Sequence, residues 1–518
     1  MNGAQALIRT LVASGVDVCF ANPGTSEMHF VAALDDVPEM RGILTLFEGV
    51  ATGAADGYGR MAERPAATLL HLGSGLGNGL ANLHNARRAR TPIVNIVGDH
   101  ATYHKQYDAP LDSDIETVAR NVSTWRRTPT RTQDLAGEAA QAVAAARAAP
   151  GRIATLVVPA DVSWTDGAEP AQPVAPVPPT VVDAATVAAV ATALRSGEKA
   201  ALLVGGRALR ETGLLAAARV ATATGAALLG ETFPARLERG AGLPAVDRLS
   251  YLAEFAAMQL DGIRHLVLVD AKAPVSFFAY PGKASDLVPA GCAVHLLASG
   301  SDDPVAALEA LVAELGAGDA SVTSAVASRP DRPSGALDAE TLGAAIGALL
   351  PERAIVVDEG NTAGLFASGA TAGCPRHDWL TLTGGAIGFG LPVATGAAVA
   401  CPDRPVLSLE ADGSAMYTLQ ALWTQAREGL DVTTIVLNNR SYAVLNMELQ
   451  RVGAEAAGPL SRAMLDLAEP PLDFCSLARG LGVPAARATT AEELVGHLEH
   501  AFAEPGPHLV EAVLPSLL

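Results

Sequence analysis

The feature that most constrains this chain is an acidic turn between a buried strand and a helix. Residues 406–409 form an apolar run, and the sequence Glu-Ala-Asp-Gly-Ser follows directly at 410–414. We predict a helix over 416–428 and a second buried strand over 432–437, which ends just before Asn438-Asn439. A strand, a helix and a second strand in this order are typical of a parallel, doubly wound sheet.

Two polar residues of this unit are expected to meet at one edge of the sheet. Asp412 and Asn439 each lie just past the carboxyl end of a predicted strand, where open α/β sheets bind ligands. A carboxylate and an amide oxygen suit Mg²⁺, which takes few protein oxygens and completes its shell with phosphate and water. An Asp-Gly-Ser turn by itself is common, so the prediction depends on the wider pattern.

Composition and charge exclude several classes of protein. The net charge of −19 disfavours nucleic acids and anionic membranes as partners. The five Cys show no C-x-x-C spacing, which favours free thiols over a zinc site or a disulfide framework. Every long apolar stretch is interrupted by charge or Gly, so we expect a cytoplasmic protein.

The chain divides into three α/β units separated by two linkers rich in Pro, Ala or Ser, at 167–180 and 318–337. We therefore predict the α/β class, with three doubly wound parallel-sheet domains over 1–166, 181–317 and 338–518. The predicted strands of the first two domains are 16–21, 43–47, 67–72, 92–98, 200–204, 226–229, 265–270 and 293–297.

The spacing of 27 positions between Asp412 and Asn439 resembles the thiamine-diphosphate motif of the acetolactate synthase / benzoylformate decarboxylase family, GDGS followed by NN. One departure is Ala411, where the motif has its first Gly. The resemblance covers nearly the whole chain and implies pyrimidine-binding, middle and diphosphate-binding domains. It also implies that Asp412, Asn439 and the carbonyl of Ser441 hold Mg²⁺.

The N-terminal third carries three further family features, each at the end of a predicted strand. They are the loop Asn22-Pro23-Gly24, Glu48, and a G-x-G-x-x-N stretch that ends at Asn78. The resemblance implies that Glu48 shares a proton with N1′ of the cofactor's aminopyrimidine. Taken alone, Glu48 would be an ordinary surface glutamate at the start of a helix.

The same resemblance implies further cofactor contacts in the C-terminal third. The glycine-rich stretch 384–392 would lie beneath the cofactor, where Ile387 would wedge its two rings into a V shape. The alternative for Ile387 is a core residue in front of a helix. Other cofactor contacts are expected from Asn361, Thr362, Gly385, Gly413, Ser414, Tyr417 and Tyr442.

His71 is the main acid–base candidate, because imidazole titrates close to neutral pH and relatives carry a His there. The alternative is a histidine bonded to backbone at a strand end. Thr25 occupies the loop position where relatives bind the substrate carboxylate, so the resemblance places it with Glu48 and His71 in the catalytic set.

Each subfamily's full acid–base set is incomplete in this chain. Phe278 or Ala279 stands where benzoylformate decarboxylases carry a second His, and Leu445 where pyruvate decarboxylases carry a Glu. Leu111 lies where acetolactate synthases place Phe-Gln. We therefore predict that Leu111 and Leu445 line the substrate pocket, although Leu445 is alternatively a core residue.

Some relatives hold FAD in the middle domain. In this chain Gly205-Gly206 is not a full dinucleotide fingerprint, so a purely structural middle domain is favoured.

The predicted function is decarboxylation of a 2-oxo acid that depends on thiamine diphosphate and Mg²⁺. The product is either an aldehyde or, after carboligation of the resulting enamine, a hydroxyketone. The alternatives are an acetolactate synthase-like carboligase and a non-catalytic cofactor-binding paralogue. The expected partners are a small 2-oxo acid and further copies of the chain, in a homodimer at minimum and commonly a homotetramer.

Overall fold

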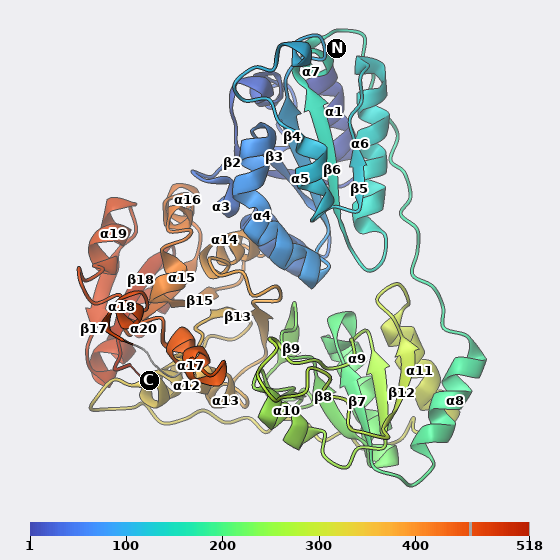
Figure 1. The fold of residues 1–518 in the computed structure, drawn as a ribbon, viewed down its shortest axis with the longest axis vertical. Coiled ribbons are helices and arrows are strands. Elements are labelled where there is room, and N and C mark those ends of the chain that lie inside the picture. The colour runs from blue at the N-terminus through green and yellow to red at the C-terminus, as the bar shows by residue number, and fades with distance from the viewer. Residues whose placement is uncertain (455–457, 517–518) are drawn as a thin grey trace.

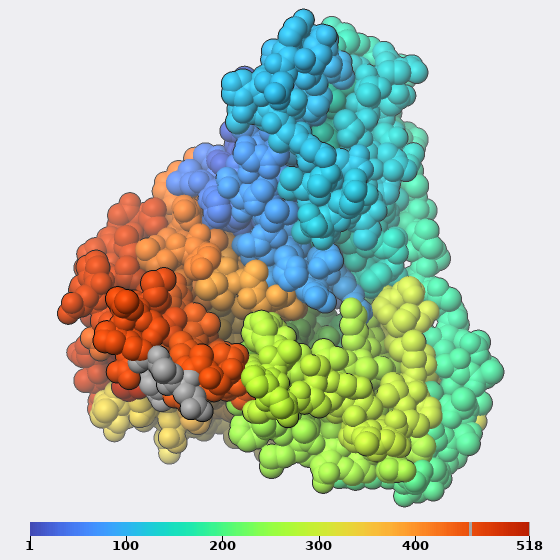
Figure 2. All heavy atoms as spheres, in the orientation of Figure 1, coloured from blue at the N-terminus to red at the C-terminus, as the bar shows by residue number. Residues whose placement is uncertain are grey.

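Three β-sheets follow one another along the chain in the computed structural model, which describes residues 1–454 and 458–516 (Figure 1). All strand pairs but one are parallel, and helices cover the sheets, which confirms the predicted α/β class. The N-terminal domain sits above the other two and touches both of them (Figure 2). No helix in the described ranges is long and apolar enough to cross a membrane.

The N-terminal domain has a sheet of six strands flanked by helices. The strands in sheet order are β2 (Arg41–Leu44), β1 (Val18–Asn22), β3 (Ala66–Leu70), β4 (Ile93–Asp99), β6 (Ile153–Pro159) and β5 (Trp125–Arg127). The helices are α1 (Gly3–Ala13), η1 (Thr25–Glu27), α2 (Met28–Ala33), α3 (Glu48–Ala62), α4 (Leu72–Ala89), η2 (Lys105–Tyr107), α5 (Ile115–Arg120), α6 (Thr132–Arg147) and α7 (Ala160–Trp164). Asn2 caps α1 through a reciprocal pair of hydrogen bonds with Gln5, as its side chain predicts.

The middle domain has a five-stranded parallel sheet. Its strands in sheet order are β10 (Asp247–Arg248), β8 (Ala227–Gly230), β7 (Ala200–Val204), β11 (His265–Val269) and β12 (Ala293–Ala298). Its helices are α8 (Ala184–Leu194), η3 (Gly206–Leu209), α9 (Glu211–Thr224), α10 (Ala253–Gln259) and α11 (Pro304–Leu315).

The C-terminal domain has a sheet of seven strands. Its strands in sheet order are β17 (Ala485–Ala488), β18 (His508–Val513), β16 (Val432–Asn438), β15 (Val406–Ala411), β13 (Ile355–Glu359), β14 (His377–Thr381) and β9 (Leu237–Arg239). Its helices are α12 (Ala339–Leu349), α13 (Leu365–Ala370), α14 (Gly390–Ala400), α15 (Asp412–Ala415), α16 (Gln420–Glu428), α17 (Ala443–Arg451), α18 (Pro459–Ala463), α19 (Phe474–Gly480) and α20 (Ala491–Ala503).

Three details of the sequence-based assignment were wrong. The strand predicted over 43–47 ends at Leu44, and Glu48 begins α3 with Phe47 as its N-cap. The helix predicted over 416–428 begins late, because residues 416–419 form a turn and α16 starts only at Gln420. The antiparallel strand β9 comes from the middle of the chain and pairs with β14, so one edge of the third sheet is not parallel.

Two glycine-rich helices, α3 and α14, hold the N-terminal and C-terminal domains together. A Cβ atom on Gly57 would overlap the carbonyl oxygen of Val393, and one on Gly396 would overlap that of Ala54. The two backbones therefore touch directly, which is possible only because glycine lacks a side chain.

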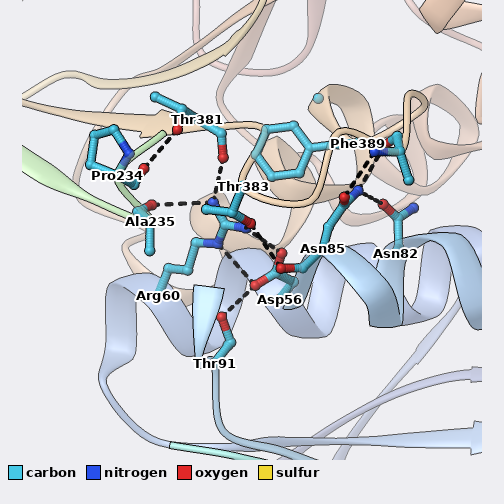
Figure 3. Close-up of polar contacts among 12 residues, drawn as sticks. Asp56, Arg60, Asn82, Asn85, Thr91, Pro234, Ala235, Thr381, Thr383 and Phe389 are labelled. Atoms are coloured by element: carbon cyan, nitrogen blue, oxygen red, sulfur yellow. Dashed lines mark hydrogen bonds and ion pairs between the residues drawn. The ribbon is translucent and has the colours of Figure 1, made fainter. Parts of the chain in front are cut away.

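A buried ion pair closes the same junction (Figure 3). Arg60 Nη2 donates to Asp56 Oδ2 at 2.7 Å, and Arg60 Nη1 donates to the Thr381 carbonyl at 2.8 Å and to the Ala235 carbonyl at 3.2 Å. One guanidinium thus bonds to α3, to the end of β14 and to the segment before β9. Because its charge is paired and its donors are used, its burial is tolerated.

Substituting Gly57 by Ala should destabilise the protein by about 1–3 kcal/mol, because the added methyl group collides with a backbone carbonyl that cannot move freely. The measurement is the free energy of unfolding in denaturant. The control is Gly137→Ala in α6, where an added Cβ would meet nothing within 4 Å and should stabilise by up to about 1 kcal/mol. Equal effects of the two substitutions would contradict the close-contact explanation.

Candidate functional site

The predicted metal residues lie together at the carboxyl edge of the C-terminal sheet. β15 and β16 are parallel neighbours, so Asp412 and Asn439 follow adjacent strands. Asp412 is buried and accepts the backbone N–H groups of Gly413 at 2.7 Å and Arg440 at 2.6 Å. The side-chain oxygen of Asn439 accepts the N–H of Ser441 at 3.0 Å. A carboxylate, an amide oxygen and a backbone turn thus share one small region.

The donor set at this edge fits a hard divalent cation beside a phosphate. Burial raises the pKa of Asp412, and the N–H groups around the carboxyl oppose that shift. In the described part of the chain, the hydrogen bonds to Asp412 come from backbone N–H groups, and no basic side chain donates to it. An oxygen cluster of this kind is what Mg²⁺ prefers.

The glycine-rich loop with Ile387 is held from two sides. From α4, the Asn85 side chain donates to the Ala386 carbonyl at 2.7 Å, and that of Asn82 donates to the Gly388 carbonyl at 3.2 Å. From β13, Glu359 accepts the N–H groups of Gly388, Phe389 and Gly390 at 2.9, 2.8 and 2.5 Å. Half-buried Ile387 therefore sits between two fixed peptide groups.

Beneath that loop, Glu359 faces a second buried carboxyl, Glu410, across the β13–β15 pair. Burial raises the pKa of both groups, and the neighbouring Glu359 raises that of Glu410 further. Three N–H donors favour the ionised form of Glu359, so we assign the proton that the pair shares to Glu410.

A second cluster lies at the carboxyl edge of the N-terminal sheet. His71 is the N-cap of α4, and its Nδ1 lies 2.8 Å from Oε2 of Glu27, a buried carboxylate that also accepts the Gly24 N–H at 2.7 Å. A Nδ1–H donated to Glu27 leaves Nε2 of His71 free for proton transfer. Burial raises the pKa of Glu27, whereas Gly24 and His71 lower it.

Glu48 and Asn78 belong to the same N-terminal cluster. The Asn78 side chain donates to Glu48 Oε2 at 3.0 Å, and Glu48 is buried at the first turn of α3. A Cβ on Gly75 would lie 3.0 Å from Glu48 Oε1 and 3.4 Å from the Cβ of His71, so both side chains pack on this glycine.

The remaining predicted residues lie around these two clusters. Asn361 donates to the hydroxyl of Ser414 at 3.3 Å, and the Tyr442 ring packs against Gly413 so closely that a Cβ on Gly413 would collide with it.

The predicted substrate-contact residues are exposed. Thr25, which follows Gly24, is exposed, and so are the pocket candidates Leu111 and Leu445. The positions that complete the predicted set are Asn22 at the end of β1, Pro23, half-buried Thr362, exposed Gly385 and exposed Tyr417.

Among the described residues, no hydrogen bond or ion pair joins Glu48, His71 or Asn78 directly to Asp412, Asn439 or Ser441.

Sequence reasoning missed Glu27, Glu359, Asn82 and Asn85. A signal existed for Glu27, since it closes the loop Asn-Pro-Gly-Thr-Ser-Glu, and for Glu359, since it follows the apolar run 354–357. Glu359 lies near the carboxyl end of a predicted strand, as Asp412 does, and Glu27 ends the loop that follows one. The two asparagines lie on a helix and contact a loop some 300 positions later, so their roles were visible only in the structure.

Comparison with known proteins agrees with this geometry. The thiamine pyrophosphate enzyme N-terminal TPP-binding domain matches residues 1–122, and the C-terminal TPP-binding domain matches 358–512. A Mycobacterium tuberculosis protein provisionally named acetolactate synthase large subunit IlvX is 63% identical over the full length of both chains. Benzoylformate decarboxylase of Pseudomonas aeruginosa is 31% identical and covers 96% of each chain.

Solved structures share the fold. A Rhodococcus jostii 4-hydroxybenzoylformate decarboxylase, itself dependent on thiamine diphosphate, superposes with a TM-score of 0.86 at 24% identity and covers 99% of each chain. At that identity the match supports the three-domain fold alone.

Substituting Glu359 by Ala should loosen the Ile387 loop, because three buried N–H groups lose their acceptor at about 1–3 kcal/mol for each group left unpaired. Amide hydrogen exchange at Gly388, Phe389 and Gly390 should accelerate by at least tenfold. Glu352→Ala, an exposed position just before β13, is the control and should leave these amides unchanged. Unchanged exchange in Glu359→Ala would show that the carboxylate does not hold the loop.

Proposed function

Because the chain belongs to the thiamine pyrophosphate enzyme family, we propose that it decarboxylates a 2-oxo acid with the help of thiamine diphosphate and Mg²⁺. The observation that carries the proposal is the buried oxygen cluster of Asp412 and Asn439 at the ends of adjacent parallel strands. That cluster provides what a phosphate-bound Mg²⁺ requires, and its position matches the family's C-terminal domain.

The C-terminal domain would hold the diphosphate and the metal. Asp412, Asn439 and the Ser441 carbonyl are the proposed metal ligands, and Asn361 with Ser414 would contact the diphosphate. Ile387, fixed between the peptide groups that Asn85 and Glu359 bind, would hold the cofactor's rings in position. When bound, the cofactor would supply a thiazolium ring that takes up the electron pair left behind when CO₂ departs.

The N-terminal domain would move the protons. Glu48 is proposed to hold a proton on the pyrimidine nitrogen N1′, with Asn78 fixing the orientation of its carboxylate. His71, oriented by Glu27, would present Nε2 to the substrate as acid and base. Exposed Thr25 is the proposed contact for the substrate carboxylate, and Leu111 and Leu445 are the proposed apolar walls of the substrate pocket.

We propose at least a homodimer, commonly a homotetramer, in which the Glu48 cluster of one subunit faces the Asp412 cluster of the next. The resemblance to the thiamine pyrophosphate enzyme family supports this arrangement. A cytoplasmic location is proposed because the five Cys, at 19, 292, 374, 401 and 475, are free thiols, which is typical of a reducing compartment.

A second candidate is an acetolactate synthase-like carboligase, which the name of the 63% identical relative favours. The Glu27–His71 pair instead favours the decarboxylase, because an oriented imidazole can protonate the reaction centre and release an aldehyde. Both reactions begin by releasing CO₂ from a 2-oxo acid and differ in the final product.

The proposed function is tested by supplying the purified protein with thiamine diphosphate, Mg²⁺ and a panel of 2-oxo acids, with and without an acceptor aldehyde. We expect CO₂ release that needs the cofactor, with an aldehyde as product. A hydroxyketone or acetohydroxy acid would indicate the carboligase. No turnover of any acid, with the cofactor bound, would contradict both and favour a non-catalytic paralogue.

Substituting Glu48 by Gln should leave the cofactor bound but slow exchange of its C2 proton by orders of magnitude, because an amide cannot share a proton with N1′. Exchange is followed by NMR after transfer into deuterated water and an acid quench, and cofactor affinity by calorimetry. Exposed Glu39→Gln is the control and should behave as the wild type. Exchange at the wild-type rate in Glu48→Gln would remove this residue from the mechanism.

A further inference from the structure

The strand order of the middle-domain sheet reverses at one point, and we call the region just outside the carboxyl ends of the strands there the crevice. β7 lies between β8, which follows it in the chain, and β11, which comes later, so the reversal falls between β7 and β11. In open α/β sheets this position, at the carboxyl ends of the strands, is where ligands bind. Gly205 and Gly206 follow β7, and Asp270 follows β11.

The groups that would bind a phosphate there are already used. The N–H of Gly206 donates to Oε1 of Glu231 at 2.9 Å, and the N–H of Arg207 donates to Oδ2 of Asp270 at 3.1 Å. Any Cβ on Gly206 would overlap Asp270, so the carboxylate fills the space above the turn. Helix α9 begins only at Glu211, so no long helix points its N-terminus at the turn.

The crevice instead holds a cation from another domain. Arg90, the C-cap of α4 in the N-terminal domain, forms an ion pair with Asp270, whose side chain is only 5% exposed. A Cβ on Gly300 would lie 2.5 Å from Arg90 Nη1, so the guanidinium also packs against the backbone after β12. Two carboxylates and a close-packed backbone favour a guanidinium and repel a phosphate.

The backbone conformation of Arg90 and Asp270 indicates that the surrounding structure holds both residues in place. Arg90 has φ +58° and Asp270 has φ +52°, so both partners of the ion pair are held in the left-handed region that favours glycine. Non-glycine residues persist there when the surrounding structure holds them in place.

We propose that this crevice is a guanidinium-binding site that Arg90 fills as an intramolecular ligand, and that it takes no flavin or other nucleotide. The site thereby anchors the C-terminal end of α4, the helix that starts after His71 and binds the Ile387 loop through Asn82 and Asn85.

Arg90→Gly in the full-length holoenzyme gives a test that depends on the sign of the effect. Glycine adopts the left-handed conformation without strain. If Arg90 served only as a helix cap, this substitution would therefore make the protein more stable. We expect the opposite: a lower midpoint of thermal unfolding, restored in part by millimolar methylguanidinium and not by methylammonium at equal ionic strength. A midpoint at or above that of the wild type, or equal effects of the two cations, would overturn the proposal.

Glu63→Gly is the matched control. Glu63 is the C-cap of α3 with φ 53°, its side chain is half exposed, and its ion pairs with Arg210 and Arg236 are long, at 3.5 and 3.8 Å, so glycine there should cost less than at Arg90 and be insensitive to methylguanidinium. If Arg90→Gly fails to fold, Arg90→Lys, which keeps the charge but loses the planar fork, should show the same selective rescue.

Nucleotide binding is tested on the wild-type protein with FAD and ADP. We expect no flavin absorbance in the purified protein and no saturable shift of the unfolding midpoint with either compound. A bound flavin, or a saturable shift that Arg90→Gly strengthens, would show that the crevice is a nucleotide site and overturn the proposal.

Discussion

The contact between α3 and α14 sets the distance between Glu48 and the loop that carries Ile387. α3 begins at Glu48, and α14 begins directly after the loop that carries Ile387. Because Gly57 and Gly396 allow the two backbones to touch, the helices have little freedom to separate or slide. Glu48 and the Ile387 loop of one chain are therefore fixed relative to each other.

Helix α4 extends this constraint to all three domains. Its N-cap is His71, its first turns carry Asn78, its later turns bind the Ile387 loop, and its C-cap, Arg90, pairs with Asp270 of the middle domain. A helix is stiff along its axis, so a shift at one end moves every contact along it. The middle domain, far in sequence from either cluster, can influence both through this one helix.

The site residues that the sequence predicts are those whose signals are local. Asp412 and Asn439 follow apolar runs that are predicted as strands, and His71 lies near the end of another, so all three candidates could be named without tertiary information. The turn at 416–419, which delays the start of the predicted helix, could not be predicted, because the hydroxyl of Thr418 binds the Gly388 carbonyl and Tyr417 packs on Gly388. Such distant contacts override local helix propensity. Strand β9 was missed for the same reason, since its three residues gain their pairing from β14.

The charges at the C-terminal edge bear on how a phosphate could bind there. Glu359, Glu410 and Asp412 are all buried at the ends of two adjacent strands. The proton that we assign to Glu410 removes one negative charge, and the three N–H groups of the Ile387 loop stabilise that of Glu359. An ionised Asp412 would repel a phosphate held beside it, because two anions in a poorly hydrated site repel strongly. A divalent cation between them would convert that repulsion into attraction, so the carboxylate that alone would exclude the phosphate would then be the group that retains it.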